Sequence, residues 1–483
     1  MLLSRGRCAG ALLFTAAAVA STPVRAAPHD DLRVRVVETR VDQSLLLAVR
    51  PSLKLVRTRR APPAHALRID TAKTYQSMIG FGAAITDASA FVLNYDLQPA
   101  QREALLAELF GPQGLHLSFV RLTIGASDFS TARYSYDDPP DGADDPALAR
   151  FSLKPAEADV IPVAKRALAL NPDLTLMASP WSAPAWMKST RNAIGGTLRP
   201  EAYGAYADYL IRYVAAMAEA GLPIAALTIQ NEPGFTPGDY PGMRLTPAAR
   251  AEFIGRFLGP RLAAAQPSTR IWDYDHNWDR TDSPLSVLKD AHARRYISGV
   301  AWHCYNGKVG AQSRVHDAAP DKDAIFTECS SGAWNGSWRK AFRILMRQLV
   351  IGAPNNWARG VALWNLALDE RHGPHLGGCG DCSGVVAVDS RTGVVTRNPE
   401  YYALGHASRF VRPGARRVAM QGGARGVDAV AFTDPHDGQT TLIAFNHART
   451  RQRLDVRVGG GRGFHYQLRP GAAATFVWTR PAP

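Results

Sequence analysis

The amino-acid sequence predicts an α/β fold, a (β/α)8 TIM barrel with an appended discontinuous β-sandwich domain. Two observations lead to this prediction. Between residues 80 and 368, short apolar runs alternate with helical patterns, and most of the runs end in polar or aromatic residues. A TIM barrel has this arrangement, because its catalytic residues come from the carboxyl ends of several strands. Both flanks show strand-like alternation interrupted by glycine, which is typical of a β-sandwich.

Length and composition indicate how the chain divides into domains. A chain of 483 residues, 46% of them hydrophobic, exceeds the size at which one core stops growing, so we expect one large domain and a smaller companion. We assign residues 76–404 to the barrel, and residues 28–75 and 405–483 to the sandwich. Neither flank has enough strands for a two-sheet core by itself. The N-terminal strands are therefore predicted to pair with the C-terminal ones.

Eight strands are predicted for the barrel. They cover residues 80–87, 117–128, 174–181, 225–232, 271–277, 299–305, 324–328 and 360–365. Helical patterns lie between most of them, at 99–110, 155–170, 200–220, 247–265 and 338–351, and several open with proline, which the first helical turn tolerates. The alternative fold, an open doubly wound sheet, needs a glycine-rich phosphate loop after its first strand. Residues 80–84 read GFGAA and lack the third glycine of that loop, so the barrel is favoured.

The first 26 residues have the pattern of a secretory signal peptide. A basic start is followed by an apolar stretch at residues 9–20 and by Val24-Arg25-Ala26, which resembles a signal-peptidase site. The alternative is an uncleaved anchor, but this apolar stretch is well short of the roughly 20 residues that a membrane helix needs. We expect an exported protein, periplasmic or extracellular, with no membrane span.

The chain is basic, with a formal charge of +14 at pH 7. A positive balance can favour nucleic acid, anionic polymers or lipid surfaces. The arginines are scattered along the sequence, however, and no nucleic-acid-binding motif accompanies them. We therefore predict a solvated, arginine-rich surface with at most weak contact to anionic surfaces, and no nucleic-acid partner. The oligomeric state is not predicted.

The cysteines predict one disulfide. Cys379 and Cys382 resemble half of a zinc site, but no second CxxC or HxxxH completes the ligands, and a local disulfide is the better interpretation in an exported protein. Cys304 and Cys329 directly follow His303 and Glu328 at the ends of predicted strands, so they could form a disulfide or remain two buried thiols. We favour two thiols, because pairing depends on a strand register that the sequence does not define.

Two glutamates are the strongest candidates for catalysis. Glu232 ends the fourth predicted strand and Glu328 the seventh. A glycosidic bond is cleaved by two carboxyl groups, one that protonates the leaving oxygen and one that attacks the sugar or activates water. Arg121, on the second strand, is expected to point into the barrel mouth and to hold Glu328 ionised, although a purely structural salt bridge would use the same contact. This chemistry needs no cofactor, and no second histidine stands at metal-ligand spacing around His303.

Four motifs resemble one known family. GFGAAITD at residues 80–87, SPWSAP at 179–184, QNEP at 230–233 and FTEC at 326–329 are similar to glycoside hydrolase family 30, the family of lysosomal glucosylceramidase and its bacterial relatives. The resemblance covers residues 67 to about 480. It implies a retaining enzyme in which Glu232 is the general acid/base and Glu328 the nucleophile. Retention requires the two carboxyl groups to lie about 5–5.5 Å apart. We expect the charge of Glu328 to raise the pKa of Glu232 until the nucleophile is consumed.

The resemblance also implies roles for the surrounding residues. Asn231 corresponds to the residue that binds the sugar 2-hydroxyl, and His303 and Tyr305 correspond to neighbours of the nucleophile. The glucose-holding residues of the family correspond to Asp128, Trp181 and Trp364. A carboxylate can accept hydrogen bonds from sugar hydroxyls, and an indole offers an apolar face to a pyranose ring.

One departure from the family pattern bears on the substrate. Where glucosylceramidases have an asparagine after strand eight that reaches the sugar, this chain has His375, which could still donate a hydrogen bond. We expect the loop from Asp369 to Cys382 to shape the entrance for the leaving group. The predicted function is a glucosylceramidase-type β-glucosidase acting on a β-glucoside or glucosylceramide. The alternatives are a β-1,6-glucanase of the same family and, from another class, a non-catalytic carbohydrate- or envelope-binding protein.

Overall fold

The computed structural model describes residues 32–57, 63 and 65–479. The predicted signal peptide at residues 1–26 lies outside these residues. Within them, no helix combines the length and the apolar character needed to cross a bilayer.

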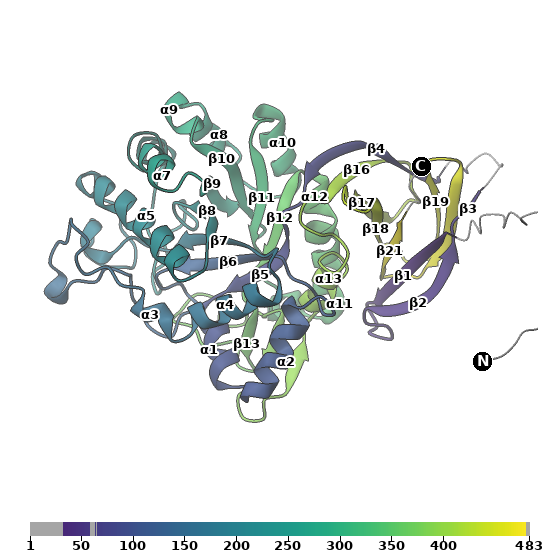
Figure 1. The fold of residues 1–483 in the computed structure, drawn as a ribbon, viewed down its shortest axis with the longest axis horizontal. Helices are drawn as coiled ribbons and strands as arrows, with labels where there is room; N and C mark the ends of the chain where they lie inside the picture. The colour runs from purple at the N-terminus through teal and green to yellow at the C-terminus, as the bar shows by residue number, and fades with distance from the viewer. Residues whose placement is uncertain (1–31, 58–62, 64, 480–483) are drawn as a thin grey trace, which may run out of the picture. The chain divides into compact units, whose positions relative to one another are not determined.

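Eight parallel strands form a closed barrel, as predicted (Figure 1). Each strand pairs with the next along the chain, and the last pairs with the first. The strands are β5 (Gly80–Ile85), β6 (Phe119–Ile124), β7 (Thr175–Pro180), β8 (Ile224–Thr228), β9 (Arg270–Asn277), β10 (Ile297–His303), β11 (Asp323–Glu328) and β12 (Ala358–Leu363). Every residue of β5 and β6 is buried, as expected for strands that are covered on both faces.

Helices surround the barrel (Figure 1). They are α1 (Asp87–Tyr95), α2 (Pro99–Phe110), α3 (Lys154–Glu157), α4 (Val160–Leu170), α5 (Tyr203–Glu219), α6 (Pro247–Glu252), α7 (Gly259–Ala265), α8 (Asp282–Leu288), α9 (Ala291–Arg294), α10 (Gly310–Ala318), α11 (Trp338–Ile344), α12 (Gly352–Asn355) and α13 (Pro399–Gly405). The side chains of Thr86 and Ser337 cap α1 and α11 by accepting backbone N–H groups. Two predicted helices each contain a π-helical segment, at Phe253–Leu258 and Leu345–Val350.

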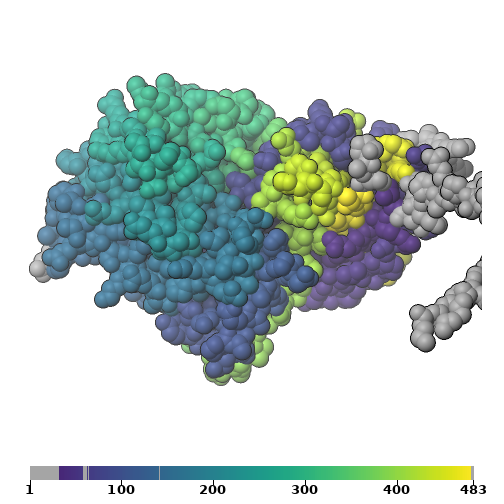
Figure 2. Space-filling view, viewed as in Figure 1, coloured from purple at the N-terminus to yellow at the C-terminus, as the bar shows by residue number. Residues whose placement is uncertain are grey.

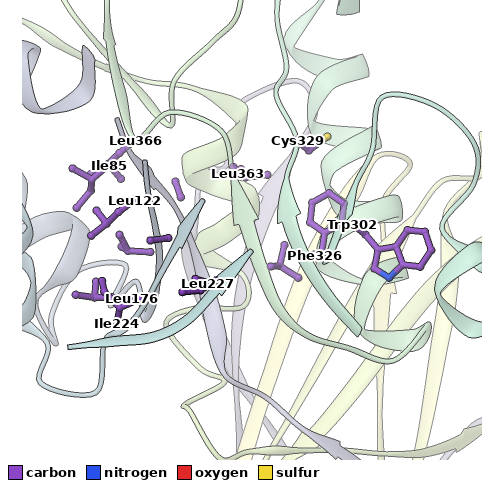
Figure 3. Close-up of a cluster of buried hydrophobic side chains, with 14 of the residues drawn as sticks. Ile85, Leu122, Leu176, Ile224, Leu227, Trp302, Phe326, Cys329, Leu363 and Leu366 are labelled. Carbon is purple, nitrogen blue, oxygen red and sulfur yellow. The ribbon is translucent and has the colours of Figure 1, made fainter. Parts of the chain in front are cut away.

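Strand alternation divides the apolar side chains of the barrel into two clusters. One cluster fills the interior and takes residues from seven strands, among them Phe119 of β6 and Trp272 of β9. The other lies between the strands and the helices and includes Leu122, Phe326 and Leu363 (Figure 3). Because successive side chains point to opposite faces of a strand, Arg121 follows Phe119 into the interior.

The flanking segments form one ten-stranded sheet, in the order β2-β1-β21-β18-β17-β16-β4-β19-β20-β3. The strands are β1 (Arg33–Arg40), β2 (Ala48–Lys54), β3 (Val56–Arg57), β4 (Leu67–Ser77), β16 (Arg416–Gln421), β17 (Val427–Thr433), β18 (Gln439–Asn446), β19 (Gln452–Val458), β20 (Arg462–Leu468) and β21 (Ala472–Thr479). β1 pairs with β21, and β4 lies between β16 and β19. In Figure 2 the purple N-terminal strands lie against the yellow C-terminal ones. The predicted discontinuous sandwich is confirmed.

A small sheet after the last barrel strand was not predicted. It consists of β13 (Ala367–Asp369), β14 (Val386–Val388) and β15 (Val395–Arg397). β13 pairs with β14, so both ends of the connection between them are held beside the barrel mouth. The Cys379–Cys382 disulfide lies in this connection, as predicted.

The expectation of two free thiols at Cys304 and Cys329 is wrong, because these residues form a disulfide. The cause is the strand register. His303 of β10 pairs with Glu328 of β11, so the residues that follow them stand side by side. The bond links the ends of two barrel strands directly behind His303 and Glu328.

Candidate active site

The two candidate glutamates lie at the carboxyl edge of the barrel, but only one of them is in a strand. Glu328 is the last residue of β11. β8 ends at Thr228, earlier than predicted, so Glu232 belongs to the following loop and has a positive φ of 47°. Non-glycine residues rarely adopt this conformation, and it is often found at functional sites. The backbone N–H of Glu232 donates to the carbonyl of Asp275 at 3.0 Å, which holds the loop across the barrel mouth.

The two carboxylates are close together. One oxygen of Glu232, one oxygen of Glu328 and a ring nitrogen of His303 all lie within 4.8 Å of one another. Inverting glycosidases separate their carboxyl groups by roughly 6.5–9.5 Å to admit a water molecule, whereas retaining enzymes hold them about 5–5.5 Å apart. The spacing is therefore that of a retaining pair.

Glu328 is held by two side chains. Nη1 of Arg121 forms an ion pair with one carboxylate oxygen, and the hydroxyl of Tyr305 donates to the other at 2.9 Å. Arg121 is completely buried, and its Nη2 donates to Asn231 Oδ1 and Asp275 Oδ2, each at 2.8 Å. A buried guanidinium with several acceptors fixes orientation as well as charge. The carboxylate of Glu328 is thus held in one orientation in the wall of the cavity.

Asp275 organises the floor of the site, and sequence analysis did not identify it. One carboxylate oxygen accepts hydrogen bonds from Ser179 at 2.5 Å and Thr228 at 2.7 Å, and the other accepts from Thr327 at 2.6 Å. Burial opposes ionisation, but the charge of Arg121, the hydrogen bond and charge of His303, and the hydrogen bond from Ser179 outweigh it and hold the pKa of Asp275 well below its usual range.

A bulge in β9 explains why Asp275 was missed. Simple alternation would place Asp273 and Asp275 on the same face, and Asp273 pairs with Arg250 at 2.8 Å. Tyr274 and Asp275 have positive φ values of 81° and 50°, and the register between β9 and β10 shifts at this point. The extra residue turns Asp275 into the barrel mouth. The sequence offers only the two aspartates, Asp273 and Asp275, near the end of the fifth strand, and no pattern that marks the bulge.

His303 lies between three carboxylates. Its Nε2 is 3.0 Å from Asp275, and its Nδ1 is 3.0 Å from Glu232 and 3.8 Å from Glu328. Burial opposes the charged imidazolium, but the neighbouring carboxylates, first Glu328 and then Asp275 and Glu232, outweigh burial and raise the pKa of His303 to about 9. The ring is therefore positively charged at neutral pH.

The expectation that the pKa of Glu232 is raised is wrong. Burial does favour the neutral carboxyl group, but the hydrogen bond with His303 and the positive charges of His303 and His276 outweigh burial and lower the pKa. The reason is that the charge of Glu328 acts first on His303, which then acts on Glu232. The charged ring of His303 therefore carries the proton that Glu232 needs to act as an acid, and a hydrogen bond connects the two groups.

The glutamates face a cavity of about 470 Å³. Asp128, Trp181 and Trp364 line it, as the family resemblance implied, together with Asn231 and Tyr305. The rings of Trp181 and Trp364 are stacked with centroids 4.8 Å apart, and the guanidinium of Arg121 lies 4.8 Å from the Trp181 centroid.

Asp128 forms a buried acidic wall of this cavity. Burial, and next the charge of Glu328, raise the pKa of Asp128 well above its usual range. A carboxyl group in this setting gains from hydroxyl donors that compensate for lost water. Gly378 lies beside it with a φ of +67°, and a Cβ there would come within 3.0 Å of the Asp128 Cβ. The glycine therefore allows the loop after strand eight to approach Asp128.

Three exposed aromatic side chains surround the mouth of the cavity, and we call them the aromatic rim. Phe235, Tyr305 and Trp334 are 47%, 45% and 52% exposed, and all line the cavity. Phe235 and Trp334 were not identified from the sequence, because a lone aromatic in a loop carries no periodic signal. Large apolar side chains that remain exposed around a concave site indicate a binding surface.

His375 does not line the cavity. It is exposed, and its ring lies 6.0 Å from that of Phe129. The residues of this loop that do line the cavity are Gly378, Cys379 and Cys382. The suggestion that His375 takes over a sugar contact is therefore not supported, whereas the role of the loop for the leaving group stays a prediction.

Glu232, His303 and Glu328 also lie close enough together to hold a metal ion. Their ligand atoms are already used, however. Both nitrogens of His303 contact carboxylates, and Glu328 accepts from Arg121 and Tyr305. We assign no metal to this site.

Two family models match the chain. The glycosyl hydrolase family 30 TIM-barrel domain matches residues 78–411, and the glycosyl hydrolase family 30 beta sandwich domain matches residues 414–476. The first of these covers more than half of the chain.

Three individual proteins illustrate the range of similarity. Endo-1,6-beta-D-glucanase neg1 of Aspergillus fumigatus is 36% identical over 396 residues, which cover 77% of this chain and 78% of that protein. Lysosomal acid glucosylceramidase of Mus musculus is 28% identical over 458 residues, covering 89% and 86%. The solved structure of the endo-beta1,6-glucanase BT3312 superposes with a TM-score of 0.85 at 31% identity and covers 93% of this chain and 99% of that one.

Proposed function

The chain belongs to glycosyl hydrolase family 30, and we propose that this glycoside hydrolase is an exported, retaining endo-β-1,6-glucanase. The observation that carries the proposal is the pair of glutamates within 4.8 Å beneath an aromatic rim. The pair supports the double-displacement chemistry, and the rim supports binding of sugars beyond the one that is cleaved. Family membership and the intact glutamate pair argue against a non-catalytic sugar- or envelope-binding protein.

In the first step of the proposed mechanism, Glu328 attacks the anomeric carbon. The bond from that carbon to the leaving oxygen breaks, and the oxygen takes a proton from Glu232, which receives it in turn from the charged ring of His303, so a covalent glycosyl-enzyme and a shortened glucan result. Arg121 and Tyr305 orient the attacking carboxylate. His303 donates a hydrogen bond to Glu232 and keeps the transferable proton one contact away.

In the second step, Glu232 removes a proton from water and returns it to His303, and the water oxygen displaces Glu328 from the anomeric carbon. The two inversions leave the original β configuration. Asn231 presents its Oδ1 to Arg121, which leaves its amide nitrogen to donate to a sugar hydroxyl. A hydrogen bond that strengthens in the transition state accelerates the reaction, whereas one equally strong in the ground state does not.

The cavity also supports a glucan as the substrate. Trp181, Trp364 and Asp128 offer an apolar face and an acceptor to one glucosyl unit. Beyond this unit, the lining alternates between the aromatic rim and small or polar residues, including Thr236 and Asp239. Sugar rings have apolar faces and polar edges and match such a surface better than alkyl chains do. The relatives named endo-1,6-beta-glucanases, at 36% and 31% identity, support the same choice.

A glucosylceramidase is the second candidate, because the similarity to lysosomal acid glucosylceramidase covers nearly the whole chain and the first sugar subsite suits both substrates. The test is to incubate purified enzyme with a linear β-1,6-glucan and, separately, with glucosylceramide in detergent. We expect the glucan to yield a ladder of short oligosaccharides whose new reducing ends are β-anomers when first formed. Release of glucose alone, or faster cleavage of glucosylceramide, would reject endo-glucanase action.

Export is proposed from residues 1–26 alone, which lie outside the described residues. N-terminal sequencing of the protein recovered outside the cytoplasm should start at Ala27. A protein retained inside with Met1 intact would reject this part of the proposal.

A further inference from the structure

A second cavity, of about 320 Å³, lies where the barrel meets the sandwich, and we call it the basic groove. Arg339 and Arg343 of α11 line one side, and Phe445, His447 and Arg449 at the end of β18 and in the loop after it line the other. The basic groove shares no lining residue with the catalytic cavity. Its volume is within the range of small-ligand sites, about 300–1,000 Å³.

The arginines of the basic groove lack a partner among the residues that the structure describes. Arg339, Arg343 and Arg449 are exposed, and within the described part of the chain none of them forms an ion pair or a hydrogen bond. Asp428, which faces His447 of the basic groove, is already engaged by Arg347 at 2.6 Å. His447 lies 3.6 Å from the other oxygen of Asp428. The basic groove therefore carries an uncompensated positive charge.

The folded chain assembles this charge from separate segments, which corrects the expectation of merely scattered arginines. Arg339 and Arg343 are one helical turn apart and share a face of α11. Arg449 comes from the sandwich. Burial, opposed by Asp428, and then the charges of Arg347 and Arg343 lower the pKa of His447. Like charges held close together repel one another, so a bound anion is favoured.

We propose that the basic groove binds a phosphate ester. Arginine suits this ligand because its planar guanidinium offers paired N–H donors to two phosphate oxygens at once. Phe445 provides an apolar wall for the carbon part of the ester, and the volume exceeds that of a bare phosphate. The ester is supplied either by a small soluble molecule or by the headgroup of a phospholipid. The proposal is independent of the catalytic assignment, since no residue of the basic groove touches the reacting groups.

The test measures thermal unfolding of the full-length protein in a zwitterionic buffer with increasing glycerol phosphate, against sodium chloride of equal ionic strength. Because a ligand that binds only the folded state stabilises it, we expect glycerol phosphate to raise Tm by roughly 1–3 °C beyond the effect of chloride. The variant Arg343→Gln/Arg449→Gln should lose this increase. Arg314→Gln, which removes an exposed arginine from α10, is the matched control and should retain it.

The same experiment separates ligand binding from a structural role. Without phosphate, the double variant should unfold at the Tm of the wild type or slightly above it, because repulsion is relieved. A lower Tm without phosphate, an equal phosphate response in wild type and double variant, or no response in the wild type would each overturn the proposal. Sedimentation with phosphatidylglycerol vesicles then identifies the source. Cosedimentation that the double variant loses assigns a lipid headgroup, and phosphate stabilisation without cosedimentation assigns a soluble ester.

Discussion

The catalytic cavity and the basic groove both concentrate arginine, but they treat its charge in opposite ways. In the catalytic cavity, Arg121 is fully buried and contacts Glu328, Asn231 and Asp275. In the basic groove, Arg339 and Arg343 are exposed and contact no acid among residues 32–57, 63 and 65–479. A buried charge must have permanent partners, whereas an exposed charge is solvated and can exchange water for a ligand. The charge of Arg121 therefore positions catalytic groups, whereas the charges of Arg339 and Arg343 are available for binding.

The largest effect should follow from removing the carboxylate of Glu328, which Arg121 positions. Glu328→Gln keeps the shape of the side chain but cannot form the glycosyl-enzyme, and we expect kcat on β-1,6-glucan to fall by roughly 10⁴- to 10⁶-fold. Initial rates of reducing-end formation measure this loss. If Glu328→Gln retained more than about a hundredth of wild-type activity, another residue would have to be the nucleophile.

Glu232→Ala provides the contrast within the same cavity. It removes the acid, which typically contributes about 10²–10⁴-fold, but leaves the nucleophile intact. Aryl β-glucosides with good leaving groups should therefore still form the glycosyl-enzyme, and added azide should accelerate turnover and give a β-glucosyl azide. Rescue of Glu328→Gln instead of Glu232→Ala would exchange the two roles.

The same arginine-to-glutamine substitution in the catalytic cavity and in the basic groove tests whether the two regions hold charge differently. Arg121→Gln removes the guanidinium that pairs with Asp275 and Glu328 and leaves His303 as their neighbouring cation, and breaking a buried pair in this way costs about 3–5 kcal/mol of unfolding free energy. Arg343→Gln should change the unfolding free energy by less than about 0.5 kcal/mol, as expected for a surface position. Denaturant unfolding of both variants measures the difference. Equal effects would show that the two regions do not differ in how they hold charge.

Several parts of the catalytic cavity could be predicted from the sequence because they follow from periodicity. The alternation of strands and helices located both glutamates at the barrel edge, and the alternation within β6 aimed Arg121 inward. Other parts depend on local departures from that periodicity. Asp275 enters the site through a bulge, and Glu232 leaves its strand early and takes a positive φ. Neither departure leaves a pattern in the sequence.

The remaining features depend on tertiary contacts between distant segments. The Cys304–Cys329 disulfide requires the register of two parallel strands, which side-chain patterning alone does not set when both strands are buried on both faces. The basic groove requires α11 to meet the loop after β18, so that arginines far apart in the chain line one cavity. These arginines look dispersed along the sequence, because only the packing of the barrel against the sandwich brings them together.

The histidines of the two regions predict a difference in pH dependence. The pKa of His303 is raised to about 9 in the folded chain, from about 6.5 when unfolded. Because its pKa is raised on folding, protonated His303 contributes its full stabilisation of the fold below about pH 6.5. This contribution is lost as the pH rises through about 9. Wild-type unfolding free energy should therefore decrease between these pH values by up to about 3 kcal/mol relative to His303→Gln.

His447→Gln is the matched control in the basic groove, because the pKa of His447 is lowered and not raised. Between about pH 6.5 and 9, its unfolding free energy should follow that of the wild type. Denaturant titrations at a series of pH values measure both slopes. A wild-type slope identical to that of His303→Gln would mean that His303 is not held as an imidazolium by its three carboxylates.

The smallest effect concerns the Cys379–Cys382 disulfide in the wall of the catalytic cavity. Among the described residues, no disulfide lines the basic groove. Four residues close this loop, so the bond removes little chain entropy, roughly 2 kcal/mol or less, and its loss should leave the fold intact. Cys379 and Cys382 line the cavity, whereas the contacts that position Glu328 come from Arg121 and Tyr305. In Cys379→Ser/Cys382→Ser, KM for the glucan should therefore rise about two- to fivefold, because a looser wall must be ordered on binding at a cost of about 0.5–1 kcal/mol. The kcat on a small aryl β-glucoside should stay unchanged, since that substrate does not extend to the wall. A parallel loss on both substrates would show that the loop acts on the reacting groups and not on the leaving glucan.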